Sequence, residues 1–290
     1  MIQHLLQRRE IPSENLTLLN TLIAAHFLWI YFSLSGFADF TRFPPDFYEP
    51  FGLFRLLPRI EQAFIFHFFD YLYLVSLGLF VCGYFPRSAI LIAALAAVFL
   101  FGYHQNYSYV KRAEAAIVIS LGLLFFSEAS RTNKAGDSRI LWIFRAQIIF
   151  IFFSAALEKI LNSGGSWLSG DLLSRGLAWN QVSQAEWMSN ALLFDQAGWI
   201  YSNPGLCRFF AILCLALEFF SPLALFSKRA AVLIIPALFF FQIAIWQFMA
   251  INFIFYYMPL FLVWLPWERK FLDKAVSNIF AIFALKSPRT

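Results

Sequence analysis

The feature that most constrains the fold is a series of apolar runs, each about as long as a bilayer is thick. A helix needs roughly 20 apolar residues to cross the hydrocarbon core. Breaks containing charged residues, Pro or Gly separate these runs, which cover about residues 16–37, 63–83, 88–103, 113–127, 140–161, 208–226, 230–248 and 252–267. The pattern predicts an all-α fold, a polytopic membrane helix bundle with about eight transmembrane helices. A seven-helix bundle is the alternative, because the break FMAIN between the last two runs is slight.

Composition supports a membrane protein with little room for a soluble domain. The 290 residues are 60% hydrophobic and only 13% charged, and 38 of them are Phe. The net charge of +5 does not indicate nucleic-acid binding, since the basic residues lie in short connections and near the C-terminus, where membrane topology explains them. The first residues lack an apolar core followed by a cleavage site, so we expect no removable signal peptide.

The distribution of Lys and Arg predicts the orientation in the membrane. With eight spans, the N-terminus and the C-terminus lie on the same side of the membrane, and the connections on that side are richer in Lys and Arg than those on the other side. This bias places both termini in the cytoplasm, most simply at a bacterial inner membrane. We expect residues 1–271 to form one transmembrane domain and residues 272–290 a short basic cytoplasmic tail. The extracytoplasmic side then carries two long segments, 38–62 and 162–207, whose aromatic residues favour re-entrant or interfacial packing.

In this topology, polar and titratable residues gather on the extracytoplasmic side. Such a gathering is typical of a site that opens to that side, but it is also what ordinary helix ends at an interface look like. The residues in question are His67, Asp70, His104, Asn106, Tyr109, Glu114, Glu158, Lys159, Gln247 and Asn252.

Lys159 is the sharpest candidate for chemistry. An amine in apolar surroundings loses part of its preference for the charged form and can act as a base near neutral pH. The small residues 154–156 just before it would let another helix approach closely. The alternative is an interfacial lysine that reaches the headgroups. Glu158 is adjacent in sequence but about 100° away on a helix, so the two are not expected to pair simply as neighbours.

Glu218 is the second ionisable group in an apolar run. It lies near the middle of the sixth span, where a charge costs on the order of 3 kcal/mol. We therefore expect a partner or a proton on its carboxylate, and Arg145, His26 and Ser221 are candidate partners. A structural tie and a proton relay explain it equally well. The three cysteines have no CxxC spacing and are interpreted as packing thiols, and no histidine spacing indicates a metal site.

Several segments resemble one known family. RAQIIFIFFSAALEKILNSGGSWLSG is similar to the part of vitamin K-dependent gamma-carboxylases in which Arg-x-Gln leads to Tyr-Phe-x-Ala-Gly-x-x-Lys-Leu and then Trp-x-x-Gly. WQFMAINFIFYYMPLFLVWLPWERKF resembles the same proteins' Ile-Gly-x-Phe-x-Tyr-x-Met stretch and the Trp-x-Arg-Lys after it, with weaker matches in FDYLYLVSLGLF and at residues 106–109. Together these cover most of residues 15–271, the membrane unit called the horizontally transferred transmembrane (HTTM) domain.

The resemblance implies a role for individual residues. In the carboxylases, the lysine at the position of Lys159 is taken to be the base that starts oxygenation of vitamin K hydroquinone. Trp167 falls on the tryptophan of the family's Trp-x-x-Gly, so we count it among the candidate binding residues. A family histidine is Tyr107 here and another is Gln242, and the large soluble region of the carboxylases has no counterpart, so glutamate carboxylation itself is not expected.

Two functional hypotheses from different classes follow. The first is an enzyme at the extracytoplasmic face that uses a quinone-like, lipid-soluble cofactor on a small or peptide substrate. Its candidate catalytic residues are Lys159, Glu158 and Glu218. The second is a noncatalytic membrane scaffold or maturation factor for a secreted peptide or a partner membrane protein. A transporter would require inverted repeats or broken spans in matching halves, and the sequence contains no such repeat.

Overall fold

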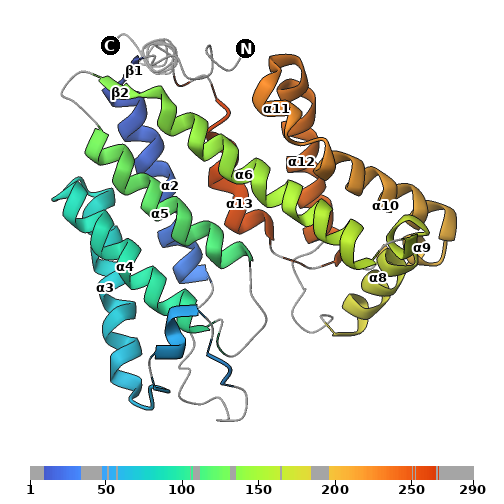
Figure 1. Cartoon of the computed structure of the whole chain (residues 1–290), viewed down its shortest axis with the longest axis horizontal. Coiled ribbons are helices and arrows are strands. Elements are labelled where there is room, and N and C mark those ends of the chain that lie inside the picture. The colour runs from blue at the N-terminus through green and yellow to red at the C-terminus, as the bar shows by residue number, and fades with distance from the viewer. Residues whose placement is uncertain are drawn as a thin grey trace, which may run out of the picture. The chain divides into compact units, whose positions relative to one another are not determined.

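The fold is almost entirely helical in the part of the chain that the structure, a computed structural model, describes (Figure 1), which confirms the all-α prediction. The described residues are 10–33, 48–50, 52–56, 58–104, 106, 112–130, 135–163, 165–183, 196–249, 251, 253–265 and 267. The expected tail, 272–290, lies outside them. The chain forms two compact units: unit 1 is Met1–Phe144 with Leu262–Thr290, and unit 2 is Arg145–Phe261.

Unit 1 is built around four long helices and the start of a fifth. The long helices are α2 (Ser13–Ser33), α3 (Ala63–Val81), α4 (Pro86–His104) and α5 (Arg112–Ser130), followed by α6 (Ser138–Glu158), and a short 3-10 helix, η3 (Gly52–Leu56), precedes α3. Two three-residue strands that the sequence did not reveal, β1 (Glu10–Pro12) and β2 (Ala135–Asp137), pair antiparallel and bring the starts of α2 and α6 together.

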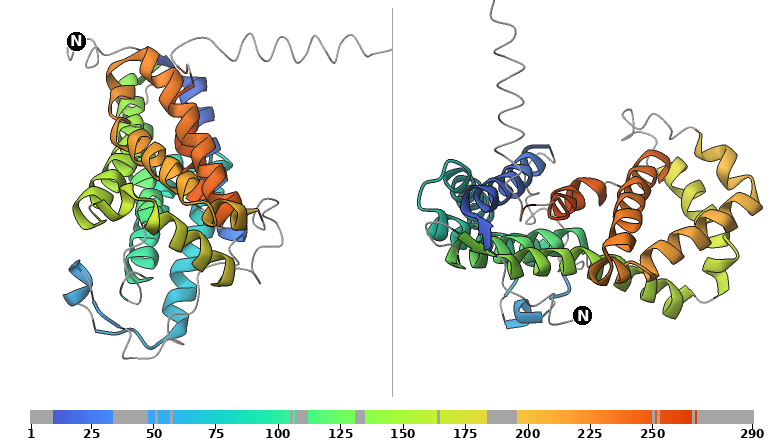
Figure 2. Two further views of the ribbon diagram at one scale, coloured as in Figure 1. Left: turned by 90° about the vertical axis from the view of Figure 1, so that its right-hand side faces the viewer. Right: turned by 90° about the horizontal axis from the view of Figure 1, so that it is seen from above.

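The helices of unit 1 run alternately up and down, as expected for successive membrane spans (Figures 1 and 2). At one end, the Tyr31 hydroxyl of α2 donates to Asp70 Oδ2 of α3 at 2.6 Å. At the other end, Arg87 Nε of α4 donates to the main-chain carbonyl of Glu128 on α5 at 3.1 Å. Each contact joins the last turns of one helix to the first half of its neighbour, as antiparallel packing requires.

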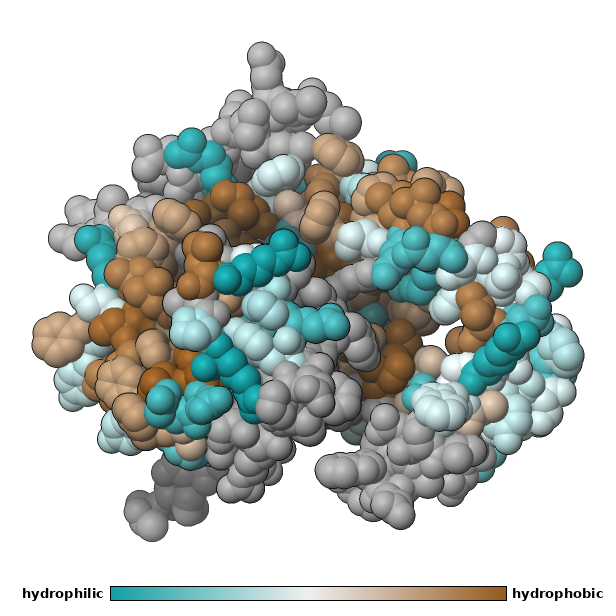
Figure 3. Space-filling model, turned by 60° about the horizontal axis from the view of Figure 1, so that its bottom comes forward, coloured by the Kyte–Doolittle hydropathy of each residue, from teal (hydrophilic) through white to brown (hydrophobic). Residues whose placement is uncertain are grey.

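α3 shows how these helices divide between protein and lipid. One face buries Phe66, Tyr73, Leu77 and Phe80, whereas Phe64, Phe68 and Tyr71 on the other face are 59–69% exposed. Large apolar side chains on an outer surface are costly in water but suit lipid tails. In Figure 3, apolar side chains likewise reach the surface over wide areas of the face shown. The outer face therefore fits an integral membrane protein.

Unit 2 contains the rest of α6 and the remaining helices. A π-helical turn, η4 (Lys159–Ser163), continues α6, and then come α7 (Gly165–Leu168), α8 (Asp171–Ser183), α9 (Ala197–Tyr201), α10 (Pro204–Phe219), α11 (Leu223–Phe226), α12 (Lys228–Met249) and α13 (Phe253–Leu262), whose last residue belongs to unit 1. The start of α10 is well defined: Pro204 is its first residue, and the Asn203 side chain accepts from the backbone N–H groups of Gly205 and Leu206 at 3.1 and 3.2 Å.

The short helices α7 to α9 pack onto α10 and α12 rather than forming loops. Leu177 of α8, Ala197 and Ile200 of α9 and Cys207 of α10 form a buried cluster, against which Met249 of α12 packs. Most of the expected long segment 162–207 is thus helical and packed, although residues 164 and 184–195 lie outside the described part.

All eight apolar runs contain helix, but only some are full-length spans. In the part of the chain that the structure describes, five helices are long and apolar enough to cross a membrane: Ser13–Phe32, Ala63–Val81, Pro86–His104, Arg139–Ser163 and Lys228–Met249. The sixth run is broken after Phe219 by a turn at residues 220–222, where Pro222 cannot donate a helical hydrogen bond. The last run yields the ten-residue helix α13, separate from α12.

Candidate functional site

The candidate site begins where α6 changes its winding. α6 ends at Glu158, and residues Lys159–Ser163 continue as a π-helical turn. Such turns are rare and occur often at functional sites, because they change the direction in which the following side chains point. Here the change falls on Lys159, the residue that the sequence singled out.

Lys159 forms an ion pair with Glu218 of α10. The Nζ atom donates to Glu218 Oε2, and the side chains are 21% and 4% exposed, respectively. Among the partners that the sequence suggested for Glu218, the Ser221 hydroxyl instead donates to the main-chain carbonyl of Glu218, at 2.7 Å. The sequence thus identified both members of the pair as candidate residues. It did not predict that they form an ion pair with each other.

Trp167 forms the next wall of the site. Its ring centroid lies 5.1 Å from Lys159 Nζ, a cation–π distance, and its indole N–H donates to the main-chain carbonyl of Ala211 at 3.1 Å. Gly170, two residues after α7, adopts φ +86° and lies against the backbone of α10. A Cβ atom at this position would be 2.5 Å from the backbone nitrogen of Arg208. Residues 159–170 therefore wrap onto α10.

Cys214 is a member of the site that the sequence reading missed. It lies one helical turn before Glu218 on α10 and is 5% exposed, so its thiol is on the same face of the helix as the Glu218 carboxylate. Cys207 and Cys214 are both buried free thiols, as the packing interpretation predicts. The sequence signal for a place in the site was that Cys214 precedes Glu218 by four residues, which puts both side chains on one face of a helix.

The pair can carry charge in two ways. It is either an ammonium beside a carboxylate or a neutral amine beside a carboxylic acid, and one proton transfer interconverts them. Apolar surroundings destabilise the charged form of the pair more than the neutral form. The arrangement can therefore hold and move a proton, and it can also simply fasten the end of α6 to α10.

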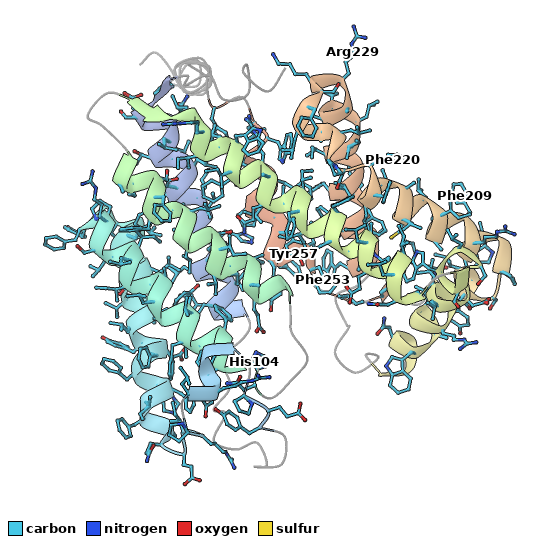
Figure 4. All side chains as sticks on the ribbon, in the orientation of Figure 1. His104, Phe209, Phe220, Arg229, Phe253 and Tyr257 are labelled. Carbon is cyan, nitrogen blue, oxygen red and sulfur yellow. The ribbon has the colours of Figure 1, made fainter. Side chains whose placement is uncertain are left out.

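The predicted residues of unit 1 come together in two smaller groups. Asp70 accepts from Tyr31, as described above. His104 Nδ1 lies 2.9 Å from Glu114 Oε1, with the side chains 20% and 7% exposed (Figure 4 labels His104). The sequence placed both groups on one side, and they lie at the same end of unit 1.

The remaining predicted residues are less closely connected to these groups. Asn106 is buried, and its carbonyl accepts from the Glu49 backbone N–H at 2.7 Å. His67 on α3 and Glu158 are exposed, and Gln247 on α12 is partly buried. Tyr109 and Asn252 lie outside the described residues. That the residues of unit 1 share one site with Lys159 stays a prediction, since they belong to the other unit.

Gln242 is a further buried polar residue in unit 2. It is 2% exposed, and its Oε1 atom has no hydrogen-bond partner among the described residues. A buried carbonyl oxygen without a donor is costly, so its position is a candidate for contact with a ligand hydroxyl.

Comparisons with known proteins give no match: no protein-family model fits the chain, and no curated protein or solved structure is significantly similar to it. The functional argument therefore depends on the geometry of the site.

Proposed function

We propose that the protein is a membrane enzyme in which Lys159 acts as a base on a lipid-soluble, quinone-like molecule, in order to modify a small or peptide substrate at the extracytoplasmic face. The observation that carries this proposal is the ion pair between Glu218 and Lys159, which is the first residue of the π-helical turn. The two residues after Lys159 are exposed. Ile160 is 41% exposed and Leu161 is 79% exposed. An ionisable pair directly beside lipid-facing residues is accessible to a molecule that arrives through the bilayer.

The chemistry assigned to the pair is proton transfer. Glu218 takes the ammonium proton of Lys159 in the neutral form of the pair, which leaves a free amine next to the Trp167 ring. The amine can then accept a proton from an acidic group, and Glu218 returns to the carboxylate when the first proton leaves. General bases of this kind contribute about 10²- to 10⁴-fold to a rate.

The residues present fit a quinone-like cofactor in two respects. The exposed side chains of Ile160 and Leu161 offer an apolar approach, and the Trp167 ring offers a flat surface. A hydroquinone, when bound, would supply an acidic hydroxyl and two reducing electrons.

The membrane assignment extends this proposal. Helices long and apolar enough to span a bilayer support an integral membrane protein. We further propose the bacterial inner membrane as its location, with both termini cytoplasmic, and membership of the HTTM domain proteins. The last point is supported by the sequence resemblance around Lys159.

The decisive experiment separates a base from a structural tie. Lys159→Arg keeps the positive charge and can still pair with Glu218, but a guanidinium does not give up its proton. Purified wild type and variant in nanodiscs are supplied with a reduced short-chain quinone in air-saturated buffer, where dissolved oxygen is the electron acceptor, and oxidation of the hydroquinone is followed by ultraviolet absorbance. We expect Lys159→Arg to fold with nearly normal thermal stability and to lose about 10²-fold or more of the rate.

Controls make the result specific. Lys228→Arg is the matched variant, since Lys228 is an exposed lysine at the start of α12, and it should keep full activity. Mass spectrometry of lipids that purify with the wild type identifies the natural quinone. Full quinone-dependent turnover in a folded Lys159→Arg protein would contradict the role of Lys159 as a base.

A noncatalytic scaffold for a secreted peptide is the second candidate, and one observation favours it. Trp179 on α8 and Trp199 on α9 are 70% and 69% exposed, and exposed aromatic residues on packed short helices are typical of docking surfaces. The scaffold hypothesis predicts that Lys159→Arg retains function, whereas loss of Trp179 and Trp199 abolishes peptide maturation.

A further inference from the structure

Unit 1 contains a cavity that the proposed function does not use. It has a volume of about 810 Å³ and opens to the surface between the start of α2, the start of α4 and Glu128 near the end of α5. Figure 2 (right) looks onto this end of the unit. Cavities of roughly 300–1,000 Å³ are typical of small-molecule sites.

The cavity wall carries charges of both signs in fixed positions. Arg87 is tied by its Nε to the main-chain carbonyl of Glu128, and a guanidinium held in this way retains four N–H donors on its terminal nitrogens. The Glu128 carboxylate accepts from Asn20 Nδ2 at 2.8 Å and belongs to a residue that is 3% exposed. Glu14 is an exposed carboxylate on the same lining.

The remaining polar lining consists of hydroxyl groups, on Ser13, Thr17, Thr21 and Ser88. Together with one guanidinium, they suit phosphate and ester oxygens, which accept hydrogen bonds. The Arg87 guanidinium and the exposed Glu14 carboxylate lie on the same wall, which makes the wall complementary to a zwitterion. Arg87 would bind its phosphate, and Glu14 would bind its ammonium.

The position of the cavity favours a lipid as the source of this zwitterion. α2 and α4, two of the helices long enough to span a membrane, begin at the cavity, so it lies at the boundary of the bilayer. The lining runs along α2 from Ser13 to Thr21, a rise of about 12 Å, which exceeds the roughly 5–8 Å of one headgroup layer. The cavity therefore reaches from the headgroups to the level of the acyl chains.

An aromatic residue at the rim provides apolar contact at this boundary. Phe85, which lines the cavity, is 78% exposed and adopts φ +47°, a conformation that non-glycine residues rarely adopt. Its neighbour Pro86 starts α4. Phe85 thus presents its ring to the surroundings beside the polar cavity, as residues at membrane interfaces do.

We propose that this cavity binds the headgroup of a phosphatidylethanolamine-type phospholipid, with its phosphate on Arg87 and the neighbouring hydroxyls and its ammonium on Glu14. Phosphatidylcholine keeps the positive charge but has no N–H donor, so it should bind less well. Phosphatidylglycerol lacks the ammonium.

The test uses the full chain in nanodiscs that contain equal amounts of phosphatidylethanolamine and phosphatidylglycerol. Lipids retained after transfer to detergent are counted by native mass spectrometry. We expect wild type to retain phosphatidylethanolamine selectively and Arg87→Ala to lower its occupancy about tenfold, the effect of one charge-assisted hydrogen bond. Arg229→Ala is the matched control, because Arg229 is an exposed arginine at the start of another helix (Figure 4).

Further variants keep the proposal falsifiable if Arg87→Ala does not fold. Glu14→Gln changes only an exposed side chain and should weaken selectivity for phosphatidylethanolamine over phosphatidylglycerol. Equal retention of all lipids by wild type, or unchanged selectivity in both variants, would overturn the proposal. Displacement of the lipid by an equal concentration of soluble phosphoethanolamine would assign the site to a free metabolite instead, and would also overturn it.

Discussion

Each unit contains an acid–base pair of similar burial, and the two pairs are built differently. In unit 1, His104 and Glu114 are ten residues apart, at facing ends of consecutive helices. In unit 2, Lys159 and Glu218 are 59 residues apart, and the pair depends on both a π-helical turn and the packing of α10. The His–Glu pair is a local contact, whereas the Lys–Glu pair fastens two distant segments.

The chemistry of the two pairs differs as well. Imidazole is neutral over much of the physiological pH range, so a histidine that loses its carboxylate need not remain as a buried charge. Lysine is normally charged, and a lone ammonium in an apolar region is costly. The unit 2 pair therefore couples protonation to packing more strongly than the unit 1 pair does.

Removing one carboxylate at a time should produce the largest difference between the pairs. Glu218→Leu leaves the Lys159 amine without its partner, and we expect the free energy of unfolding to fall by about 3–5 kcal/mol. Glu114→Leu should cost about 1–2 kcal/mol, because the imidazole can be neutral. Unfolding of both variants in mixed micelles, followed by tryptophan fluorescence, measures the two values.

The double variant Lys159→Met with Glu218→Leu is the control for this prediction. It removes both charges and leaves two apolar side chains, so it should regain most of the lost stability. Equal losses for Glu218→Leu and Glu114→Leu, or no recovery in the double variant, would show that the pair of unit 2 is not special.

The second largest difference in stability is expected between substitutions of two glycines, Gly170 in unit 2 and Gly102 in unit 1. Gly170→Ala would place a Cβ 2.5 Å from the backbone nitrogen of Arg208, at a φ of +86°, so both the turn and α10 must shift. Gly102→Ala on α4 meets only the ring of Phe54, at 2.5 Å, and a ring can rotate or move. We expect a loss of about 2–3 kcal/mol for Gly170→Ala and a change within about 1 kcal/mol for Gly102→Ala.

The same unfolding measurements decide this second prediction. Activity of a folded Gly170→Ala protein should also fall, since residues 159–170 carry Lys159 and Trp167 to the pair. A loss at Gly102 as large as that at Gly170 would contradict the view that the wrapped segment of unit 2 is the more tightly constrained.

Much of the fold could be predicted from the sequence because a membrane span is a local property. Apolar runs about as long as a bilayer is thick are visible residue by residue, and the helices found lie close to the expected ranges. β1 and β2 were not predicted, because three residues such as Glu10–Pro12 show no periodicity. The break before Pro222 was visible only as a single proline.

The site could be predicted only in part, because its contacts join residues far apart in the chain. Lys159 and Glu218 each stood out as a charge in an apolar run, and Asp70 did so likewise. Their partners did not stand out: a π-helical turn has no sequence signature, and the docking of α10 depends on Gly170 and Asn203. Tyr31, the donor to Asp70, is one of many aromatic residues.

The smallest expected effect concerns the aromatic wall of the unit 2 pair. Trp167→Leu removes a cation–π contact at 5.1 Å and a hydrogen bond to Ala211, which together should cost about 1–2 kcal/mol of stability. Trp199→Leu is the matched control, because Trp199 is 69% exposed and should change stability by less than about 0.5 kcal/mol.

This last prediction also separates the two candidate functions. If Trp167 holds the amine of Lys159 in place, Trp167→Leu should slow quinone-dependent turnover while Trp199→Leu leaves it unchanged. If the protein is a scaffold that uses its exposed aromatic residues, the order is reversed, and Trp199→Leu is the variant that loses peptide maturation. Measuring both readouts on both variants therefore shows whether the pair in unit 2 serves chemistry or only holds α6 to α10.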